Sequence, residues 1–252
     1  MKHLFHRDHS EILSTLSKRR VLLAFDFDGT LAPIVSHRDQ AQMRPETAAS
    51  FAALCRKFPC AVISGRGLAD LRPRLRGARV KYVIGNHGLE PSPDQAKYRR
   101  DMQEALRTLR RDLDGLVGVD IEDKKYSLAI HYRRSPNKRS SRQKVKKAIE
   151  ALPLDVRLVA GKLVLNVVPE GAPHKGDALK ALCKAERARA CLYVGDDVTD
   201  EDVFRLTDLP ALIKLRVGPS RSSAADYYLQ DQGAIDTLLA KLLDLGDKAA
   251  GP

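Results

Sequence analysis

The chain has few cysteines and no long apolar segment, and both absences limit what it can be. Its 252 residues include four cysteines, whose spacing matches neither a zinc site nor a disulfide framework. We therefore expect buried, reduced thiols and a cytoplasmic protein. No apolar run approaches the ~20 residues that span a bilayer. The N-terminus, MKHLFHRDHSEIL, carries charges where a signal peptide has its apolar core, so we expect no membrane partner.

The chain is rich in positive charge, but its basic segments contain few aromatic residues. Lysine and arginine number 44 against 32 acidic residues, which gives a net charge of +12 at pH 7. Such a charge suits nucleic acid, a membrane surface or an anionic small molecule. Proteins that bind single strands stack the bases on aromatic side chains, so the shortage argues against nucleic acid. Solvated helix faces explain the basic clusters better, and we expect a small anionic substrate.

The segment VLLAFDFDGT, residues 21–30, combines a buried strand with two acids at its end. Its first apolar residues predict a parallel strand that is covered on both faces. Asp26 and Asp28 follow at the carboxyl end, where open α/β sheets bind ligands, and strand alternation directs both to one side. Their charges call for a partner such as Mg²⁺, although a solvated turn is the alternative. Gly29 permits a sharp turn, and Thr30 offers a hydroxyl to a phosphate oxygen.

Strands and helices alternate on both sides of a middle segment that has a different pattern. Short strands are predicted at residues 21–24, 60–63, 82–84, 190–194 and 211–217, with helices between them. This alternation predicts a parallel sheet with right-handed crossovers. The middle segment follows the order helix, two strands, helix, two strands, which is typical of an α+β module. We therefore predict an α/β fold with a catalytic core, residues 1–88 and 170–252, and an inserted cap domain, residues 89–169.

Two further motifs of the predicted core suggest phosphate binding. Ser64-Gly65-Arg66 follows the second strand, and its hydroxyl and backbone N–H groups are suited to a phosphoryl oxygen. The same sequence is also a common turn. Lys175 stands just before a helix, where a cation is unfavourable unless it has an anionic partner. It either neutralises a phosphate or a carboxylate, or it is a solvated loop lysine.

A third motif concentrates acidic residues at the end of another predicted strand. The segment GDDVTDED, residues 195–202, contains five acids in seven positions. Without a counter-charge these acids would repel one another, so Mg²⁺ is again the natural partner. Asp197 and Asp200 are alternatively candidates for capping the following helix.

Together, and in this order, these motifs resemble those of the haloacid-dehalogenase (HAD) superfamily of phosphotransferases. The resemblance implies a HAD-like Rossmannoid core. It makes Asp26 the nucleophile that forms an aspartyl-phosphate, and Asp28 the acid/base. Lys175 would act with phosphoryl contacts from Thr30, Ser64, Gly65 and Arg66. The implied Mg²⁺ ligands are Asp26, Asp28 and Asp196, supported by Asp197 and Asp200.

A longer set of segments resembles the trehalose-6-phosphate phosphatase family. These segments are DFDGTLAPI, SGR, GNHGLE, HYR, HKGDAL and GDDVTDEDVF, spread over residues 21–205. The resemblance implies Mg²⁺-dependent hydrolysis of trehalose 6-phosphate, with an α/β cap that closes over the disaccharide. Candidate sugar or closure contacts are Asn86, His87, Glu90 and Arg133. The alternative explanation is loop capping for Asn86 and His87, and an ordinary strand charge for Arg133.

One position departs from that family. The family usually carries a Glu in a Glu-x-x-Pro arrangement ahead of the lysine, and here Asn166 stands at that place. Its amide is able to bind sugar hydroxyls but supplies no negative charge. Phosphatases of another glycosyl phosphate, such as glucosylglycerol phosphate or mannosylglycerate phosphate, therefore stay open as alternatives.

Two other classes of protein are alternatives to this hypothesis. A basic nucleic-acid-binding protein would explain the net charge but would leave the acidic clusters unexplained. A catalytically silent partner subunit of a synthase is disfavoured by the complete set of acids. The sequence carries no direct signal of oligomeric state, and we expect a monomer.

Overall fold

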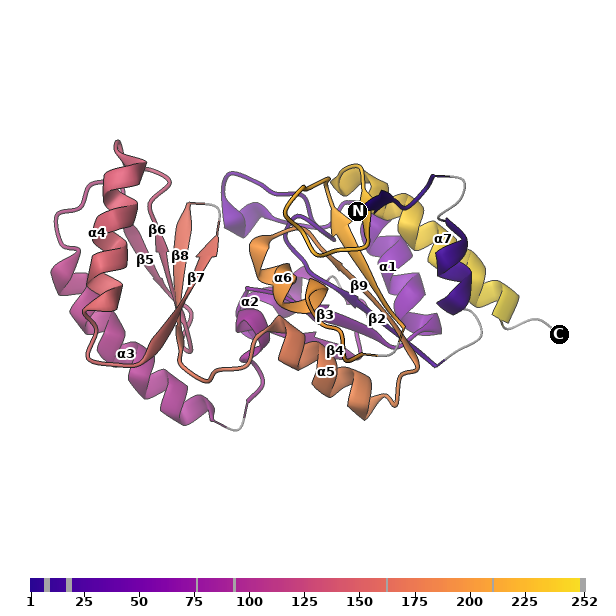
Figure 1. Ribbon diagram of the computed structural model, residues 1–252, viewed down its shortest axis with the longest axis horizontal. Coiled ribbons are helices and arrows are strands. Elements are labelled where there is room, and N and C mark those ends of the chain that lie inside the picture. Colours follow the sequence, from indigo (N-terminus) through magenta and orange to yellow (C-terminus); the bar gives the residue numbers. More distant parts are fainter. Residues whose placement is uncertain are drawn as a thin grey trace. The chain divides into compact units, whose positions relative to one another are not determined.

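The protein consists of two compact units. Figure 1 shows it as a computed structural model, which describes the chain except residues 7–9, 17–19, 76, 93, 162, 210 and 250–252. Unit 1 comprises Met1–Gly88 and His174–Pro252, and unit 2 comprises Leu89–Pro173. Unit 2 thus ends at residue 173, whereas the predicted cap ends at residue 169. The role of unit 2 as a cap stays a prediction.

Unit 1 is built on a seven-stranded parallel sheet, which the alternation of strands and helices predicts. The strand order is β1-β11-β10-β9-β2-β3-β4. The strands are β1 (Lys2–His3), β2 (Val21–Phe25), β3 (Cys60–Ile63), β4 (Tyr82–Ile84), β9 (Ala190–Gly195), β10 (Leu212–Val217) and β11 (Tyr227–Leu229). The sequence did not predict β1 and β11, because two or three residues are too few for a recognisable pattern.

Helices cover both faces of this sheet (Figure 1). Leu23 and Phe25 of β2 pack into one core with α1, α2 and α7, while Leu22 and Ala24 pack into another with α5 and α6. The strand is therefore buried on both faces, as its apolar run predicts. The helices are α1 (Pro45–Lys57), α2 (Leu68–Arg74), α5 (Lys175–Ala185), α6 (Glu201–Phe204) and α7 (Ile235–Ala249). Short 3₁₀ helices are η1 (Ser10–Leu16), η2 (Arg38–Gln40), η3 (Asn86–Gly88), η4 (Val198–Asp200) and η5 (Gln232–Ala234).

Unit 2 is a four-stranded antiparallel sheet with two helices on one face. The strand order is β5-β6-β8-β7. Its elements are α3 (Gln95–Asp112), β5 (Asp120–Asp123), β6 (Leu128–His131), α4 (Lys138–Glu150), β7 (Val156–Gly161) and β8 (Val164–Pro169). Leu165 and Val167 pack with the helices, so Asn166 between them lies on the opposite face of the sheet.

None of the helices in the described residues combines the length and the apolar character that a membrane span requires.

Candidate active site at the carboxyl ends of the parallel strands

The predicted site residues of unit 1 gather where β2, β3 and β9 end. Asp26 follows β2, Ser64 follows β3 and Asp196 follows β9. These strands are neighbours in the parallel sheet, so their carboxyl ends lie at the same edge. Lys175 is the first residue of α5, and the ring of His174 caps that helix by accepting two backbone N–H bonds. The fold thereby brings two acids, a serine and a lysine from distant sequence segments to one place.

Lys175 lies at the centre of a buried ion-pair network. Its Nζ is 2.9 Å from Oδ2 of Asp26 and 2.8 Å from Oδ1 of Asp200. The side chain of Lys175 is 1% exposed, so it is not a solvated loop lysine. Burial alone would lower the pKa of Lys175, but the carboxylates of Asp200 and Asp26 raise it above its ordinary value. The other oxygen of Asp26, Oδ1, accepts the backbone N–H of Phe27 at 2.6 Å.

The oxygens of Asp200 are occupied by donors from the protein itself. Oδ1 accepts from Lys175 and, at 2.6 Å, from the hydroxyl of Tyr193. Oδ2 accepts the backbone N–H groups of Asp196 and Asp197, each at 2.8 Å. Four donors of this kind use most of the lone pairs of a carboxylate. Asp200 therefore fixes the loop after β9 and connects that loop to Lys175.

Three carboxylates of this network lie close enough together to share a cation. One oxygen from each of Asp26, Asp196 and Asp200 lies within 4.8 Å of the other two. When all three are ionised, Lys175 balances one charge and two negative charges remain, which equals the charge of one divalent cation. Burial raises the pKa of Asp26 to about 7 and, with the neighbouring carboxylates, that of Asp196 to about 9. A donor set made of oxygens alone fits a hard cation such as Mg²⁺.

The turn after β2 approaches Asp196 closely. The hydroxyl of Thr30 lies 3.4 Å from Oδ1 of Asp196. Gly29 has φ +79°, and a Cβ at this position would lie 2.1 Å from Oδ2 of Asp196. A glycine is needed here both for the backbone conformation and for the close approach of the two loops.

Asp28 lies outside this carboxylate group and is paired with Arg66. Nε of Arg66 donates to Oδ2 of Asp28 at 2.6 Å, and Nη2 donates to Oδ1 at 2.7 Å. The side chain of Arg66 is 7% exposed, whereas that of Asp28 is 39% exposed. The two acids of the Asp-x-Asp motif thus have different partners, Lys175 for Asp26 and Arg66 for Asp28.

The SGR motif and the loop after β4 are connected by backbone hydrogen bonds. The carbonyl of Ser64 accepts the N–H of His87 at 2.9 Å, and the carbonyl of Arg66 accepts the N–H of Asn86 at 2.8 Å. A Cβ on Gly65 would lie 2.4 Å from the ring of His87. Five predicted substrate contacts therefore form one structural group beside β3.

The remaining predicted contacts belong to unit 2. Glu90 is buried, and Arg133 is exposed just after β6. Asn166 is 6% exposed, and its amide donates to a backbone carbonyl of β7 at 3.3 Å. Glu122 and His131, whose side chains are hydrogen-bonded at 2.9 Å, lie on the same face of the sheet by strand register. The sequence gave no indication of this last pair, because the two residues meet only through strand pairing.

Sequence reasoning also missed Tyr193 and Asp70. A tyrosine inside an apolar strand needs a partner for its hydroxyl, so Tyr193 could have been noticed. Asp70 accepts from Arg66 at 2.6 Å and stands four residues after it, which is the spacing of a helical ion pair. Tyr193 donates to Asp200 and Asp70 accepts from Arg66, so both residues hold predicted site residues in place.

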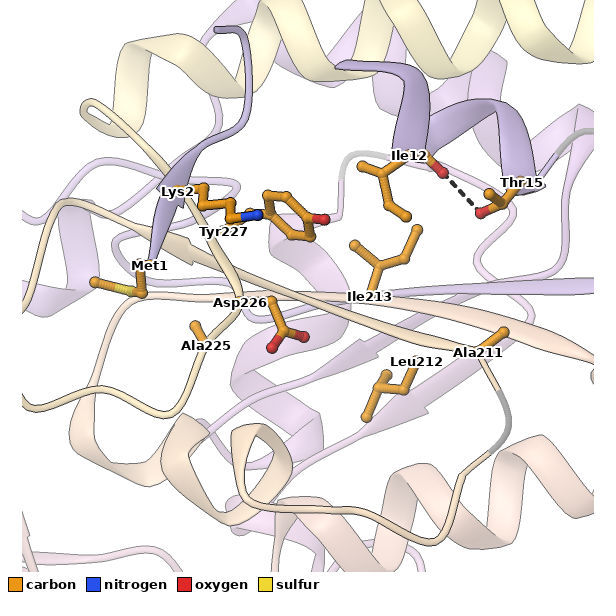
Figure 2. A pocket seen from close by; sticks show the side chains of 10 residues that line it. All are labelled: Met1, Lys2, Ile12, Thr15, Ala211, Leu212, Ile213, Ala225, Asp226 and Tyr227. Carbon is orange, nitrogen blue, oxygen red and sulfur yellow. Dashed lines mark hydrogen bonds between the residues drawn. The ribbon is translucent and has the colours of Figure 1, made fainter. Parts of the chain in front are cut away.

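A separate cavity of about 550 Å³ lies beside the amino ends of β10 and β11 (Figure 2). Its walls are mainly apolar, and they lie at the other end of the strands from Asp26. The lining residues are Met1, Lys2, Ile12, Thr15, Ala211, Leu212, Ile213, Ala225, Asp226 and Tyr227. None of the predicted site residues is among them.

The motifs at this site are characteristic of one protein family. Residues 24–232 match the family model described as trehalose-phosphatase. The chain belongs to this family. The matched range includes Asp26 and Asp28 after β2, Lys175 and the acidic loop after β9. It also includes the whole of unit 2.

Relatives of this trehalose-phosphatase family member include longer proteins. The chain is 30% identical to a trehalose-phosphate phosphatase of Mycolicibacterium paratuberculosis over 94% of its own length and 65% of the relative's. It is 31% identical to an uncharacterized glycosyl hydrolase of Mycobacterium tuberculosis, of which it spans 19%. Among solved structures, the C-terminal domain of C. albicans trehalose-6-phosphate phosphatase matches with a TM-score of 0.80 at 24% identity, covering 94% of this chain and 97% of that one. This likeness shows a common fold.

Proposed function

We propose that the chain is a Mg²⁺-dependent phosphatase that hydrolyses trehalose 6-phosphate to trehalose and phosphate. The observation that carries the proposal is the group formed by the buried side chains of Asp26, Lys175 and Asp200 with the partly exposed Asp196, at the carboxyl end of the sheet. This group provides a carboxylate as nucleophile and the ammonium group of Lys175 beside it. It also has an excess of negative charge that a metal ion could balance. Family membership supports a phosphorylated sugar as the substrate.

Asp26 is the proposed nucleophile. The N–H of Phe27 and the ammonium of Lys175 fix the two oxygens of its carboxylate. Attack of Asp26 on phosphorus forms an aspartyl-phosphate and breaks the bond to the sugar oxygen, which takes a proton from Asp28. Water then attacks the phosphorus and gives a proton to Asp28, and the carboxylate of Asp26 leaves.

The cation site that we propose consists of Asp26, Asp28 and Asp196, with Asp197 and Asp200 as supporting residues. Mg²⁺, when bound, offsets the negative charge of these acids and of the phosphoryl oxygens. Asp196 contributes an oxygen that Thr30 and the turn at Gly29 orient. The Asp28 carboxylate would have to share its oxygens with Arg66, so its contribution to the site is the least direct.

Phosphoryl binding is assigned to groups next to Asp26. Lys175 is already fixed there, and Ser64 and Thr30 offer hydroxyl groups. The backbone N–H of Gly65 is the proposed contact at that residue, and the ring of His87 occupies the place where a side chain would stand. Arg66 belongs to the same sequence motif, but its guanidinium is paired with Asp28 and Asp70, so we do not assign it to phosphoryl binding.

We further propose that unit 2 supplies contacts to the sugar. Glu90, Arg133 and Asn166 are the candidates within this unit, and Asn86 and His87 are the candidates within unit 1. The Glu122–His131 pair on the same sheet face as Asn166 adds polar groups suited to sugar hydroxyls. Because Asn166 carries no charge, phosphatases of glucosylglycerol phosphate or mannosylglycerate phosphate form a second candidate function.

The proposal also includes a monomer in the cytoplasm. The four cysteines of the chain are free thiols, which fits a reducing compartment.

A panel of substrates tests the proposed function. Phosphate release is measured from trehalose 6-phosphate, glucosylglycerol phosphate and mannosylglycerate phosphate, with Mg²⁺ and with a chelator. We expect the highest kcat/KM for trehalose 6-phosphate and no turnover in the chelator. A preference for one of the other two would establish the second candidate, and Mg²⁺-independent turnover would contradict the cation site.

A further inference from the structure

Arg66 of the SGR motif is paired with the carboxylate of Asp28. Two of its nitrogens donate to the two oxygens of Asp28 at 2.6 and 2.7 Å. A bidentate pair of this kind fixes the plane of a carboxylate as well as its distance. Asp28 keeps lone pairs that the fork does not use, and its side chain is 39% exposed.

Arg66 is itself fixed from several sides. Its Nη1 donates to Oδ2 of Asp70 at 2.6 Å, and Nη2 also donates to the backbone carbonyl of Arg38 at 2.7 Å. The guanidinium lies 5.7 Å from the ring centre of Phe27. Asp70 in turn accepts from Arg74 at 2.7 Å. The fork that holds Asp28 is therefore anchored to α2 and to the first residue of η2.

The donors of Arg66 leave little capacity for a phosphoryl group. A guanidinium has five N–H groups, and four of them make the hydrogen bonds to Asp28, Asp70 and Arg38. With 7% of its side chain exposed, Arg66 would have to break the pair with Asp28 to bind a phosphate. These contacts give Arg66 a role different from the phosphoryl binding that we assign to Ser64 of the same motif.

We propose that Arg66 is a positioning residue that aims the carboxylate of Asp28 at the water that hydrolyses the aspartyl-phosphate. This inference rests on the proposed function. In that step the water oxygen forms a bond to phosphorus, the bond between phosphorus and Asp26 breaks, and one water proton passes to Asp28. A guanidinium fork binds the carboxylate form, which is the form that accepts a proton. Loss of the fork therefore slows dephosphorylation more than phosphorylation of Asp26.

The test separates these two steps with 4-nitrophenyl phosphate and Mg²⁺ in a rapid-quench experiment. The nitrophenolate released in the first turnover needs no proton, so its burst reports the attack by Asp26 alone. The phosphoenzyme is measured as hydroxylamine-sensitive bound phosphate. The variants are Arg66→Lys, which keeps the charge but not the fork, and Asp70→Asn, which loosens Arg66 without replacing it. Arg56→Lys, the same exchange at an exposed position of α1, is the matched control.

We expect Arg66→Lys to retain the burst rate within about threefold and to slow dephosphorylation by roughly 10- to 100-fold, since general base catalysis contributes about 10²–10⁴-fold. Phosphoenzyme then accumulates in the steady state, and Asp70→Asn shows the same signature more weakly. Arg56→Lys behaves like the parent protein. If Arg66→Lys lowers the burst rate and the dephosphorylation rate equally, Arg66 is a phosphoryl ligand. If neither variant lowers either rate, Arg66 is a structural residue. Both results overturn the proposal.

Asp28→Asn distinguishes a failure of this inference from a failure of the proposed function. If Asp28→Asn accumulates phosphoenzyme and Arg66→Lys does not, only the positioning role is wrong. If neither the parent protein nor Asp28→Asn ever forms hydroxylamine-sensitive phosphate, the proposed function is wrong, and the role of Arg66 falls with it.

Discussion

At the scale of single residues, the site places several charged side chains together where they have little access to solvent. Lys175 satisfies one oxygen each of Asp26 and Asp200, while Asp196 stands nearby with a raised pKa. Buried carboxylates without a cation are unstable as ions, so they keep their protons to higher pH. One oxygen from each of Asp26, Asp196 and Asp200 lies within 4.8 Å of the other two, so these acids could hold a metal ion that offsets their charge.

The first prediction concerns pH and metal binding. Unfolded aspartates lose their protons near pH 3.8, but in the folded, metal-free protein burial raises the pKa of Asp26 to about 7 and that of Asp196 to about 9. Between these values the unfolded state binds fewer protons, so the free energy of unfolding falls as the pH rises. In a chelator, Tm should therefore decrease from pH 6 to pH 9. The increase in Tm on adding Mg²⁺ should be larger at pH 9, where fewer protons compete with the metal.

Asp196→Asn provides the control for this prediction. It removes one acid of the group, and most of the Mg²⁺-dependent increase in Tm should disappear with it. An increase in the parent protein that is equal at pH 6 and pH 9 would contradict the account of the buried charges.

At the scale of elements, the ends of β2 and β9 bring the acids together. The apolar run of β2 predicts both its burial and its parallel pairing, and the motifs after β2, β3 and β9 could be assigned to one edge of the sheet from strand order alone. The pairing of Asp28 with Arg66 could not, because it depends on where α2 and the SGR turn lie. The strands β1 and β11 escaped prediction because their pairing, rather than their own sequence, makes them strands.

A pair of glycine substitutions tests the contact between these strand ends. Gly29 and Gly218 have φ +79° and +80°, but only at Gly29 would a Cβ meet another group, Asp196. We expect Gly218→Ala to lower the free energy of unfolding by about 1 kcal/mol, because alanine disfavours this conformation, and Gly29→Ala to lower it by more, because its Cβ would also meet Asp196. Gly29→Ala should in addition weaken Mg²⁺ binding roughly tenfold, because Asp196 must move. Calorimetric titration with Mg²⁺ measures the difference, and equal affinities in both variants would refute the assigned contact.

At the scale of the whole molecule, we propose that unit 1 carries the chemistry and that unit 2 recognises the sugar. Unit 1 contains Asp26, Asp200 and Lys175, and unit 2 has Asn166 and the Glu122–His131 pair on one face of its sheet. The sequence predicted an inserted α+β segment from the change in pattern near residue 89. It could not predict which residues share a sheet face, since that is decided by register across strands far apart in the chain.

Substrate comparison in unit 2 variants tests this separation. Asn166→Leu should raise KM for trehalose 6-phosphate by roughly three- to tenfold, the equivalent of one hydrogen bond, and leave turnover of 4-nitrophenyl phosphate unchanged. Gln143→Leu, the same type of change at an exposed position of α4, should alter neither. A parallel loss on both substrates in Asn166→Leu would place the residue in the chemistry or in folding instead of in sugar recognition.

The most direct test of the central claim is phosphoenzyme formation at Asp26. The protein is mixed with trehalose 6-phosphate and Mg²⁺, quenched in acid, and the bound phosphate is located by peptide mass spectrometry. We predict hydroxylamine-sensitive phosphate on Asp26 in the parent protein, and neither bound phosphate nor turnover in Asp26→Asn with its circular dichroism unchanged. Full turnover in Asp26→Asn would contradict the account.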